Sequence, residues 1–326
     1  MSGRGAKKVA VVDGDGIGPE VVESALAVLR AAGAEFEPVF VEIGLVRWKR
    51  TGLAMSEEDL AALKECDCIF FGAIPTPPDS NYKSVLLRIR KELDLYANIR
   101  PFQSQDLDFI IVRENTEGLY SGREEMDAEQ AHTVRVITRR GSERIAEKAC
   151  ELAANRRKLT VVHKANVLKS DRLFLKTCQE TAARRAVPCE EMLVDAAAYN
   201  LVTNPERFDV LVTTNLFGDI LSDEAAGIIG SLGLCASANI GTDHALFEPI
   251  HGSAPDIAGK GIANPVGAIR SAAMMMRWLG EPEMAGRIEA AVQKALACGV
   301  KTPDLGGSSR TADVTRAISN FLMRKQ

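Results

Sequence analysis

Two carboxylates four residues apart follow an apolar run in the second half of the chain. Asp219 and Asp223 lie in "NLFGDILSDEAAG" (215–227), directly after "FDVLVTT" (208–214). Residues four apart share one face of a helix, so both carboxylates project together. Oxygen ligands suit Mg²⁺ or Mn²⁺, and open α/β sheets bind ligands where their strands end. The pair is a candidate metal site; the alternative is a solvated acidic helix face.

Three arginines stand near the ends of apolar segments. Arg90 and Arg100 lie in "LLRIRKELDLYANIRPF", and Arg113 ends the run in "IIVREN". Guanidinium groups bind carboxylates in a bidentate manner, and a charge buried without an anionic partner is costly. The set indicates a substrate with more than one carboxylate; the alternative is ordinary surface arginines.

A lysine follows another apolar run, in "VVHKANVLK" (161–169). Burial lowers the pKa of a lysine toward that of a useful general base, which makes Lys164 a candidate. The alternative is a lysine whose stem lies on apolar surface while its ammonium stays in water.

A glycine-containing loop, "FEPIHGSAPDIAGKGIANP" (247–265), leads into a helical pattern. Such loops present backbone N–H groups to phosphates. Asp256 could accept a hydrogen bond from a ribose 2′-hydroxyl and would repel a 2′-phosphate, which favours NAD over NADP.

The stretch "DGDGIG" (13–18) resembles a dinucleotide-binding turn but fails its register. The pattern G-x-G-x-x-G requires glycine at position 19, which is Pro19, and the third glycine is Gly18. Neither Glu35 nor Glu37 cleanly ends a second strand, as the acidic partner should. We therefore predict a tight strand-to-helix turn here.

These candidates need an α/β framework, and the patterning predicts one. Short apolar runs, typical of strands buried on both faces, occur at 8–12, 66–73, 108–113, 159–163 and 208–214. Helical patterns at 19–32 and 264–279 have a first-turn proline and a following glycine. Alternation of the two predicts a largely parallel sheet. The segment 119–144 fits poorly; its polar loop and alternating "HTVRVIT" indicate a β excursion or arm.

Composition excludes several classes. The 326 residues carry a formal net charge of −4 and only 5% aromatic residues, which gives no reason to expect a nucleic-acid partner. No run of 18 apolar residues or apolar signal region occurs, so we expect no membrane span and a cytoplasmic location. Seven cysteines without C-x-x-C spacing indicate thiols in a reducing compartment.

Six stretches together resemble the β-decarboxylating dehydrogenase family, which comprises isocitrate, homoisocitrate and 3-isopropylmalate dehydrogenases. They are "GDGIGPE" (14–20), "LDLYANIRP" (93–101), "VRENTEGLYSG" (112–122), "HKANVLK" (163–169), "TTNLFGDILSDEAAG" (213–227) and "ALFEPIHGSAPDIAGKGIANP" (245–265). They span nearly the whole chain in family order.

The resemblance implies an α/β isocitrate/isopropylmalate dehydrogenase-like fold that is not a Rossmann fold. A large cofactor-binding domain would combine 1–95 and 240–326. A smaller substrate and dimerisation domain would cover 96–239, with a clasp arm at about 119–140. The family implies a homodimer, or a higher oligomer, with shared active sites.

The resemblance also implies residue roles. It assigns Tyr120 and Lys164 to catalysis, and Arg90, Arg100 and Arg113 to the malate part of the substrate. The metal would be held by Asp195, Asp219 and Asp223, with Lys164 and Asp195 serving the partner's site and Asp195 also counted as catalytic. The cofactor residues it implies are Glu248, His251, Gly252, Ser253, Ala254, Asp256, Ile257 and Asn264. The implied cofactors are NAD and Mg²⁺ or Mn²⁺.

Substrate choice rests on "SNYKSVLLRIR" (80–90). Ser84 matches the position where isocitrate enzymes bind a γ-carboxylate, whereas Leu86 and Leu87 resemble the apolar pair of isopropylmalate enzymes. "NYKS" before an aliphatic pair resembles homoisocitrate enzymes, and Lys83 or Arg88 could supply a cation for a distal carboxylate. We expect a hydroxy-tricarboxylate, homoisocitrate or isocitrate, with 3-isopropylmalate as the alternative. A noncatalytic regulatory subunit is a minor alternative, because such subunits usually lose part of the catalytic set.

Overall fold

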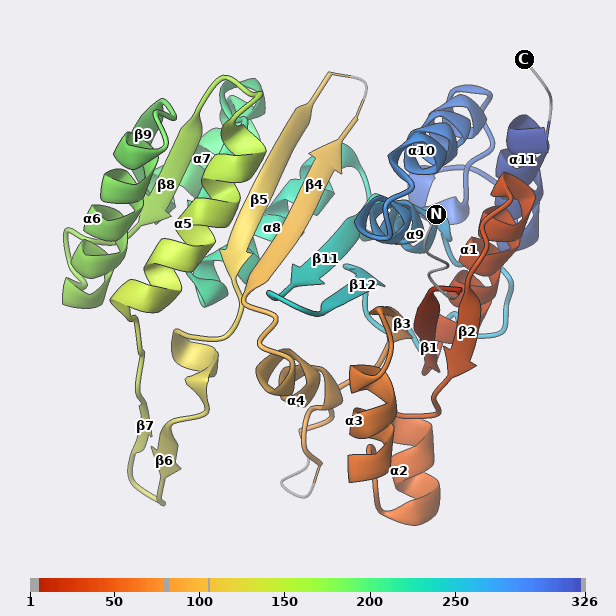
Figure 1. The fold of residues 1–326 in the computed structure, drawn as a ribbon, viewed down its shortest axis with the longest axis horizontal. Coiled ribbons are helices and arrows are strands. Elements are labelled where there is room, and N and C mark those ends of the chain that lie inside the picture. The colour runs from red at the N-terminus through yellow and green to blue at the C-terminus, as the bar shows by residue number, and fades with distance from the viewer. Residues whose placement is uncertain (1–5, 79–81, 105, 324–326) are drawn as a thin grey trace. The chain divides into compact units, whose positions relative to one another are not determined.

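The computed structural model describes residues 6–78, 82–104 and 106–323. Within them the chain forms two compact units (Figure 1). Unit 1 contains residues up to Leu93, Gly230–Ala238 and the chain from Thr242 onward; unit 2 contains Asp94–Ile229 and Asn239–Gly241. The predicted smaller domain ended at 239, but Gly230–Ala238 belong to unit 1, because β11 begins there and lies next to β12.

Unit 1 is built on strands in the order β2-β1-β3-β12-β11. The pairs β1–β2, β1–β3 and β3–β12 are parallel. Every residue of β3 and β12 is buried, as expected of strands covered on both faces. The strand bounds are β1 Lys8–Gly14, β2 Glu37–Phe40, β3 Cys68–Ala73, β11 Ala236–Ile240 and β12 Ala245–Pro249.

The helices of unit 1 follow the predicted signals. Helix α1 begins with Pro19 in its first turn and ends at Gly33, whose φ of 84° is left-handed. Helix α9 begins one residue later than predicted, because its N-cap is Pro265; Asn264 lies just before this N-cap, and its side-chain oxygen accepts the N–H of Val266, the first residue of the helix, at 3.1 Å. The bounds are α1 Gly18–Ala32, α2 Leu45–Thr51, α3 Glu57–Lys64, α4 Val85–Glu92, α9 Val266–Trp278, α10 Pro282–Ala297 and α11 Thr311–Met323, with 3₁₀ turns η3 Leu232–Leu234 and η4 Pro303–Leu305.

Unit 2 has strands in the order β4-β5-β10-β8-β9. Strand β4 is antiparallel to β5, and the other pairs are parallel. The sequence analysis did not predict β4, because Arg100 and Pro101 interrupt its apolar pattern. The bounds are β4 Ala97–Gln103, β5 Asp108–Glu114, β8 Leu159–His163, β9 Cys189–Leu193 and β10 Val210–Thr213.

Helices cover both faces of the unit 2 strands (Figure 1). Helices α5 and α6 pack together on one face, and α7 and α8 pack together on the other. Helix α8 begins two residues after β10 ends, so its first turns lie where the strands end. The bounds are α5 Arg139–Ala153, α6 Lys169–Arg184, α7 Val194–Thr203 and α8 Asn215–Ile229, with 3₁₀ turns η1 Leu119–Ser121 and η2 Pro205–Arg207.

The predicted arm is a hairpin that projects from the rest of unit 2 (Figure 1). Strands β6 (Glu124–Met126) and β7 (Ala131–Thr133) pair antiparallel, and every residue of both is exposed. The strand expected over "HTVRVIT" is shorter than predicted. Beyond β7, only Val134 and Val136 continue the pairing, to Arg123 and Gly118.

The "DGDGIG" turn packs against the backbone of Ala73 and Ser253. Its Asp15 carboxylate accepts the Leu45 N–H at 2.7 Å and so caps α2. Gly16 has φ of 62°, and a Cβ there would lie 1.9 Å from the Ser253 carbonyl oxygen. The Ile17 N–H donates to that same oxygen at 2.9 Å. The turn joins β1 to α1, as predicted, and it also serves as a platform for the 253 loop, which the sequence analysis did not predict.

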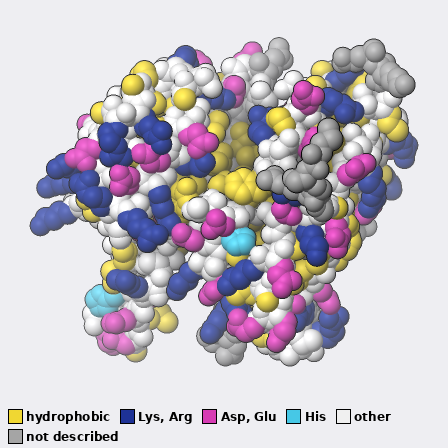
Figure 2. Space-filling model, viewed as in Figure 1, with side chains coloured by type: hydrophobic (Ala, Val, Ile, Leu, Met, Phe, Trp, Pro, Cys, Tyr) yellow, Lys and Arg dark blue, Asp and Glu magenta, His cyan; other side chains and the backbone are white. Residues whose placement is uncertain are grey.

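The fold class predicted from sequence, an α/β isocitrate dehydrogenase-like fold, is confirmed. Acidic and basic side chains are interspersed over the face in Figure 2, in keeping with the small net charge. In the part of the chain that the structure describes, no helix is long and apolar enough to cross a membrane.

Candidate active site

In unit 2, three side chains converge on the Asp219 carboxylate. Arg113 Nη1 from β5 and Arg100 Nη1 from β4 both donate to Asp219 Oδ1, the latter at 3.5 Å. The Tyr120 hydroxyl, from η1, donates to Oδ2 at 3.0 Å. The Arg113 guanidinium also lies 5.6 Å from the centre of the Tyr120 ring. Four residues predicted separately from sequence are thus brought together.

Arg113 is held by residues that the sequence analysis missed. Its side chain is 1% exposed, and Nε and Nη2 donate to Asn215 Oδ1 at 3.0 and 2.6 Å. Gly218 leaves room for its stem, because a Cβ there would lie 2.7 Å from Arg113 Cβ and Cγ. Asn215, Gly218 and Asp219 are spaced i, i+3 and i+4 on α8, which was the available signal.

Asp223 lies one turn beyond Asp219 on α8 and is exposed. Its pKa is raised above the usual 3.8, because nearby protein displaces water from the carboxylate and because Asp219 repels its charge. A divalent cation would relieve both effects. Two aspartates on one helix face fit partial coordination of Mg²⁺ or Mn²⁺, with water and substrate oxygens as further ligands.

The third predicted metal ligand lies elsewhere in the chain. Lys164, directly after β8, donates from Nζ to Asp195 Oδ1 at 2.6 Å. This hydrogen bond lowers the pKa of Asp195 below its usual range. Among residues 6–78, 82–104 and 106–323, no three acidic, histidine or cysteine side chains form a metal cluster. Within one chain, Asp195 therefore does not join Asp219 and Asp223.

Unit 1 holds the other predicted substrate residues, on and before α4. Ser84 is the N-cap of this helix, and its Oγ accepts the Leu87 N–H at 3.5 Å. Arg90 is buried and donates from Nη2 to Glu248 Oε1 at 2.9 Å. Its Nε is buried without a partner. Leu86 is half-buried, and Leu87 is 43% exposed. Ser80 and Asn81 of the predicted specificity segment lie outside the described residues.

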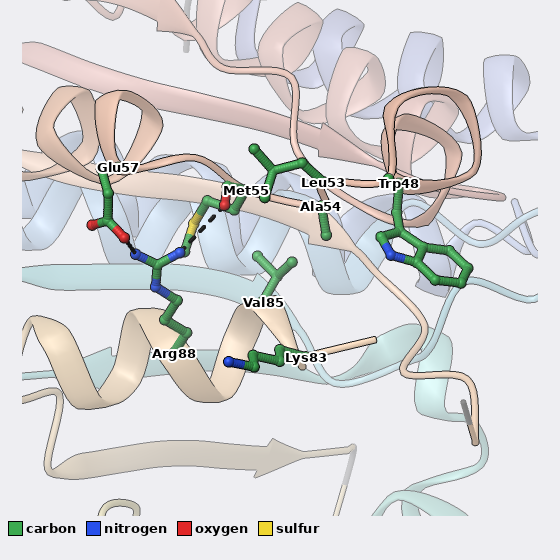
Figure 3. A pocket seen from close by; sticks show the side chains of 9 residues that line it. Trp48, Leu53, Ala54, Met55, Glu57, Lys83, Val85 and Arg88 are labelled. Carbon is green, nitrogen blue, oxygen red and sulfur yellow. Dashed lines mark hydrogen bonds and ion pairs between the residues drawn. The ribbon is translucent and has the colours of Figure 1, made fainter. Parts of the chain in front are cut away.

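Arg88 faces a pocket of about 520 Å³ within unit 1 (Figure 3). It donates to the Glu57 carboxylate and, at 3.3 Å, to the Met55 carbonyl. Each of these groups accepts from one terminal nitrogen of the guanidinium, and the role of Arg88 toward a distal carboxylate stays a prediction. Lys83, which is exposed, also lines this pocket.

Glu248 lies in β12, and the other predicted cofactor residues lie on the loop that follows this strand. His251 Nδ1 lies 2.9 Å from the Gly252 carbonyl, and its Nε2 is buried without a partner. Burial lowers the pKa of His251, which favours the neutral ring. Asp256 is exposed, and Ile257 is half-buried. Ala254 has φ of 35°, a left-handed conformation that is unusual for a non-glycine residue.

Asn264, also predicted to bind cofactor, is engaged within the protein. Its Nδ2 donates to Asp304 at 3.0 Å while its oxygen accepts the Val266 N–H. Glu20, in the first turn of α1, accepts the Ala263 N–H at 3.1 Å and the Thr311 hydroxyl at 2.8 Å. The end of the loop is therefore fixed by α1 and α11.

These features define an α/β protein with a cluster of arginines, a tyrosine and aspartates suited to an anionic ligand. Comparison with known proteins identifies the class further. The family model for isocitrate/isopropylmalate dehydrogenase matches residues 8–318. A homoisocitrate dehydrogenase of Methanocaldococcus jannaschii is 47% identical over 98% of both chains. A 3-isopropylmalate/3-methylmalate dehydrogenase of the same organism is also 47% identical, over 96% of this chain and 98% of that one.

A solved structure agrees. The crystal structure of isocitrate dehydrogenase from Methylococcus capsulatus superposes with a TM-score of 0.93 and 44% identity, covering 98% of this chain and 100% of that one. The chain therefore belongs to the isocitrate/isopropylmalate dehydrogenase family. It is a β-decarboxylating dehydrogenase, as the sequence analysis expected.

Proposed function

We propose that this enzyme oxidises and decarboxylates homoisocitrate or isocitrate with NAD⁺ and Mg²⁺ or Mn²⁺. The observation that carries the proposal is the convergence of Arg113, Arg100 and Tyr120 on Asp219. It combines cations for carboxylates, an acid and a metal ligand on adjoining elements. Relatives named for homoisocitrate support the tricarboxylate.

The proposed chemistry follows from the side chains. Arg90, Arg100 and Arg113 bind the carboxylates and orient the substrate. Lys164 accepts the proton of the C2 hydroxyl, directly or through water, while hydride leaves C2 for the nicotinamide. The bond to the β-carboxylate then breaks, CO₂ departs, and the electron pair of that bond forms an enolate. Tyr120 donates a proton to C3, which gives the 2-oxo acid.

Asp219 and Asp223 would hold the divalent cation, with Asp195 from the partner subunit as a further ligand. When bound, the cation polarises the hydroxyl and stabilises the negative charge that develops on this oxygen. The Lys164–Asp195 pair, separate from Asp219 in the chain, supports a role for both residues in a partner's site.

We propose a homodimer joined in part by the β6–β7 arm. Every residue of β6 and β7 is exposed, with Met126 85% accessible, and Val134, next to β7, is 51% accessible; this arrangement suits burial against a second copy. A monomer would then be inactive. No disulfide joins the seven cysteines, all of which lie in the described part of the chain, and we propose a reducing, cytoplasmic location.

We propose NAD⁺ as the cofactor because of Asp256. Its carboxylate is exposed in the loop after β12, where it could accept a hydrogen bond from the ribose 2′-hydroxyl. A 2′-phosphate would meet the same negative charge.

3-Isopropylmalate is the second candidate substrate. Leu87 is exposed beside the N-cap Ser84, so an apolar substituent would find a contact there. The relative named for 3-isopropylmalate and 3-methylmalate is as similar as the one named for homoisocitrate. An apolar pocket discriminates such side chains by only about 1–3 kcal/mol per methylene.

The deciding experiment measures kcat/KM for isocitrate, homoisocitrate, 3-isopropylmalate and malate, each with NAD⁺ and NADP⁺. We expect a tricarboxylate with NAD⁺ to give the highest value. A higher kcat/KM for 3-isopropylmalate would overturn the substrate assignment, and a preference for NADP⁺ would overturn the cofactor assignment.

A further inference from the structure

Arg135 and Asp171 form an ion pair in unit 2 that the proposed chemistry does not use. Arg135 lies two residues after β7, and Asp171 lies in the first turn of α6. Arg135 Nη1 donates to Asp171 Oδ1 and, at 2.6 Å, to the Ser170 hydroxyl. The Asp171 side chain is 0% exposed and that of Arg135 is 14% exposed. Such a pair is strongly directional and costly to break from one side.

The Asp171 carboxylate holds the segment that carries Lys164. Its Oδ2 accepts the backbone N–H of Lys164 at 2.7 Å. The Lys164 carbonyl in turn accepts the Leu168 N–H at 2.8 Å, and the Leu168 carbonyl accepts the Asp171 N–H at 3.1 Å. The turn between β8 and α6 is thus closed on this carboxylate.

The second terminal nitrogen of the Arg135 guanidinium contacts the segment where α8 starts. Nη2 donates to the Thr214 hydroxyl at 3.0 Å, and the group lies 5.3 Å from the centre of the Phe217 ring. The Thr214 carbonyl accepts the Gly218 N–H at 2.9 Å. Arg135 therefore contacts the first turn of the helix that carries Asp219.

The backbone next to Arg135 reaches the segment of Tyr120. Val136 and Gly118 exchange two hydrogen bonds, at 2.7 and 3.2 Å. Gly118 is the N-cap of η1, whose second residue is Tyr120. Arg135 and Val136 thereby connect three segments that are far apart in sequence. These segments carry Lys164, Asp219 and Tyr120.

We propose that Arg135 and Asp171 are positioning residues that fix the segments of Lys164, Tyr120 and Asp219 relative to one another. Their roles rest on the function proposed above. A displacement of about 1 Å in such a group can lower the rate by about a hundredfold, so a rigid connection between the segments has a direct kinetic consequence.

The test compares Arg135→Gln with Arg139→Gln. The control removes an exposed arginine at the start of α5, whose Nη1 donates to Glu180 at 2.8 Å. We expect Arg135→Gln to lower kcat by about a hundredfold and to leave the KM for NAD⁺ within about twofold. The deuterium isotope effect of a C2-deuterated substrate should rise, because the chemical steps become rate-limiting. Arg139→Gln should match the wild type in kcat, in the KM for NAD⁺ and in the isotope effect.

A double variant separates positioning from stability. Arg135→Gln alone leaves a buried carboxylate without its partner and should lower Tm. Adding Asp171→Asn removes that charge, so Tm should recover, while kcat stays low because the links to Thr214 and Ser170 are still missing. Recovery of kcat together with Tm would overturn the proposal.

Hydrogen–deuterium exchange gives a readout that does not need substrate. Arg135→Gln should speed exchange in 114–120, 163–168 and 213–219 together, whereas Arg139→Gln should leave all three unchanged. If only one segment responds, the proposal fails. A wild-type enzyme inactive on every tested malate would refute the proposed function instead, and the exchange result would still decide the connection between segments.

Discussion

Gly218→Ala is expected to damage substrate binding through Arg113. The added Cβ would lie 2.7 Å from Arg113 Cβ and Cγ, whereas carbon atoms normally approach to about 3.5–4.0 Å. The Arg113 stem or α8 must therefore move by about 1 Å. Both are held tightly, since Arg113 is fully buried and fixed by Asn215. Overpacking of this kind costs about 1–3 kcal/mol of stability.

The same displacement should also lower the rate of the reaction. A shift of about 1 Å in a guanidinium that orients a carboxylate should lower kcat/KM by about a hundredfold. The KM for NAD⁺ should change little, because Gly218 belongs to unit 2, whereas the proposed cofactor loop belongs to unit 1. Steady-state kinetics with the preferred substrate, together with Tm, measure both effects.

Gly227→Ala is the matched control on the same helix. A Cβ at Gly227 meets nothing within 4 Å, and alanine stabilises a helix interior by about 0.5–1 kcal/mol relative to glycine. This variant should retain wild-type kinetics with an equal or higher Tm. If Gly218→Ala also retained kcat/KM within about threefold, the claim that Arg113 requires this clearance would be refuted.

Three further variants, with one control, test the turn at Gly16, the proposed base and the proposed metal site. Gly16→Ala, whose Cβ would lie 1.9 Å from the Ser253 carbonyl oxygen, should raise the KM for NAD⁺ about tenfold or more. The control Gly286→Ala places its Cβ in open space and should leave this KM unchanged. Equal KM values for the two variants would contradict the platform role of the turn. Lys164→Met should abolish the dehydrogenase step, so turnover like that of the wild type would eliminate Lys164 as the base. Asp223→Asn should abolish the rise in Tm that Mn²⁺ causes. In the wild type that rise should shrink as the pH falls through the raised pKa of Asp223, because the protonated carboxyl cannot bind metal; a Tm rise independent of pH would exclude it as a ligand.

The elements around the site were largely predictable because burial on both faces gives strands a continuous apolar run. The runs ending near Arg113, Lys164 and Asp219 correspond to β5, β8 and β10. Periodicity could not find β4, because Arg100 and Pro101 break its pattern and only pairing with β5 makes it a strand. Its antiparallel direction is a tertiary property with no local signal.

The contacts of the site depended on information that spacing does not hold. Arg90 and Arg88 are two residues apart on α4, yet one is paired with Glu248 and the other with Glu57. The sequence treated both as candidates for a carboxylate of the substrate. Asn215 and Arg135 were missed because their partners are distant in sequence, and a hydrogen bond between distant segments leaves no periodic pattern.

We propose above that this site couples hydride transfer to loss of CO₂. The most direct measurement follows NADH and CO₂ together in one reaction of the purified protein with Mg²⁺, NAD⁺ and homoisocitrate or isocitrate. We expect one CO₂ for each NADH, with neither formed when Mg²⁺ is removed. Formation of NADH without CO₂, or at an undiminished rate in the presence of a chelator, would contradict it.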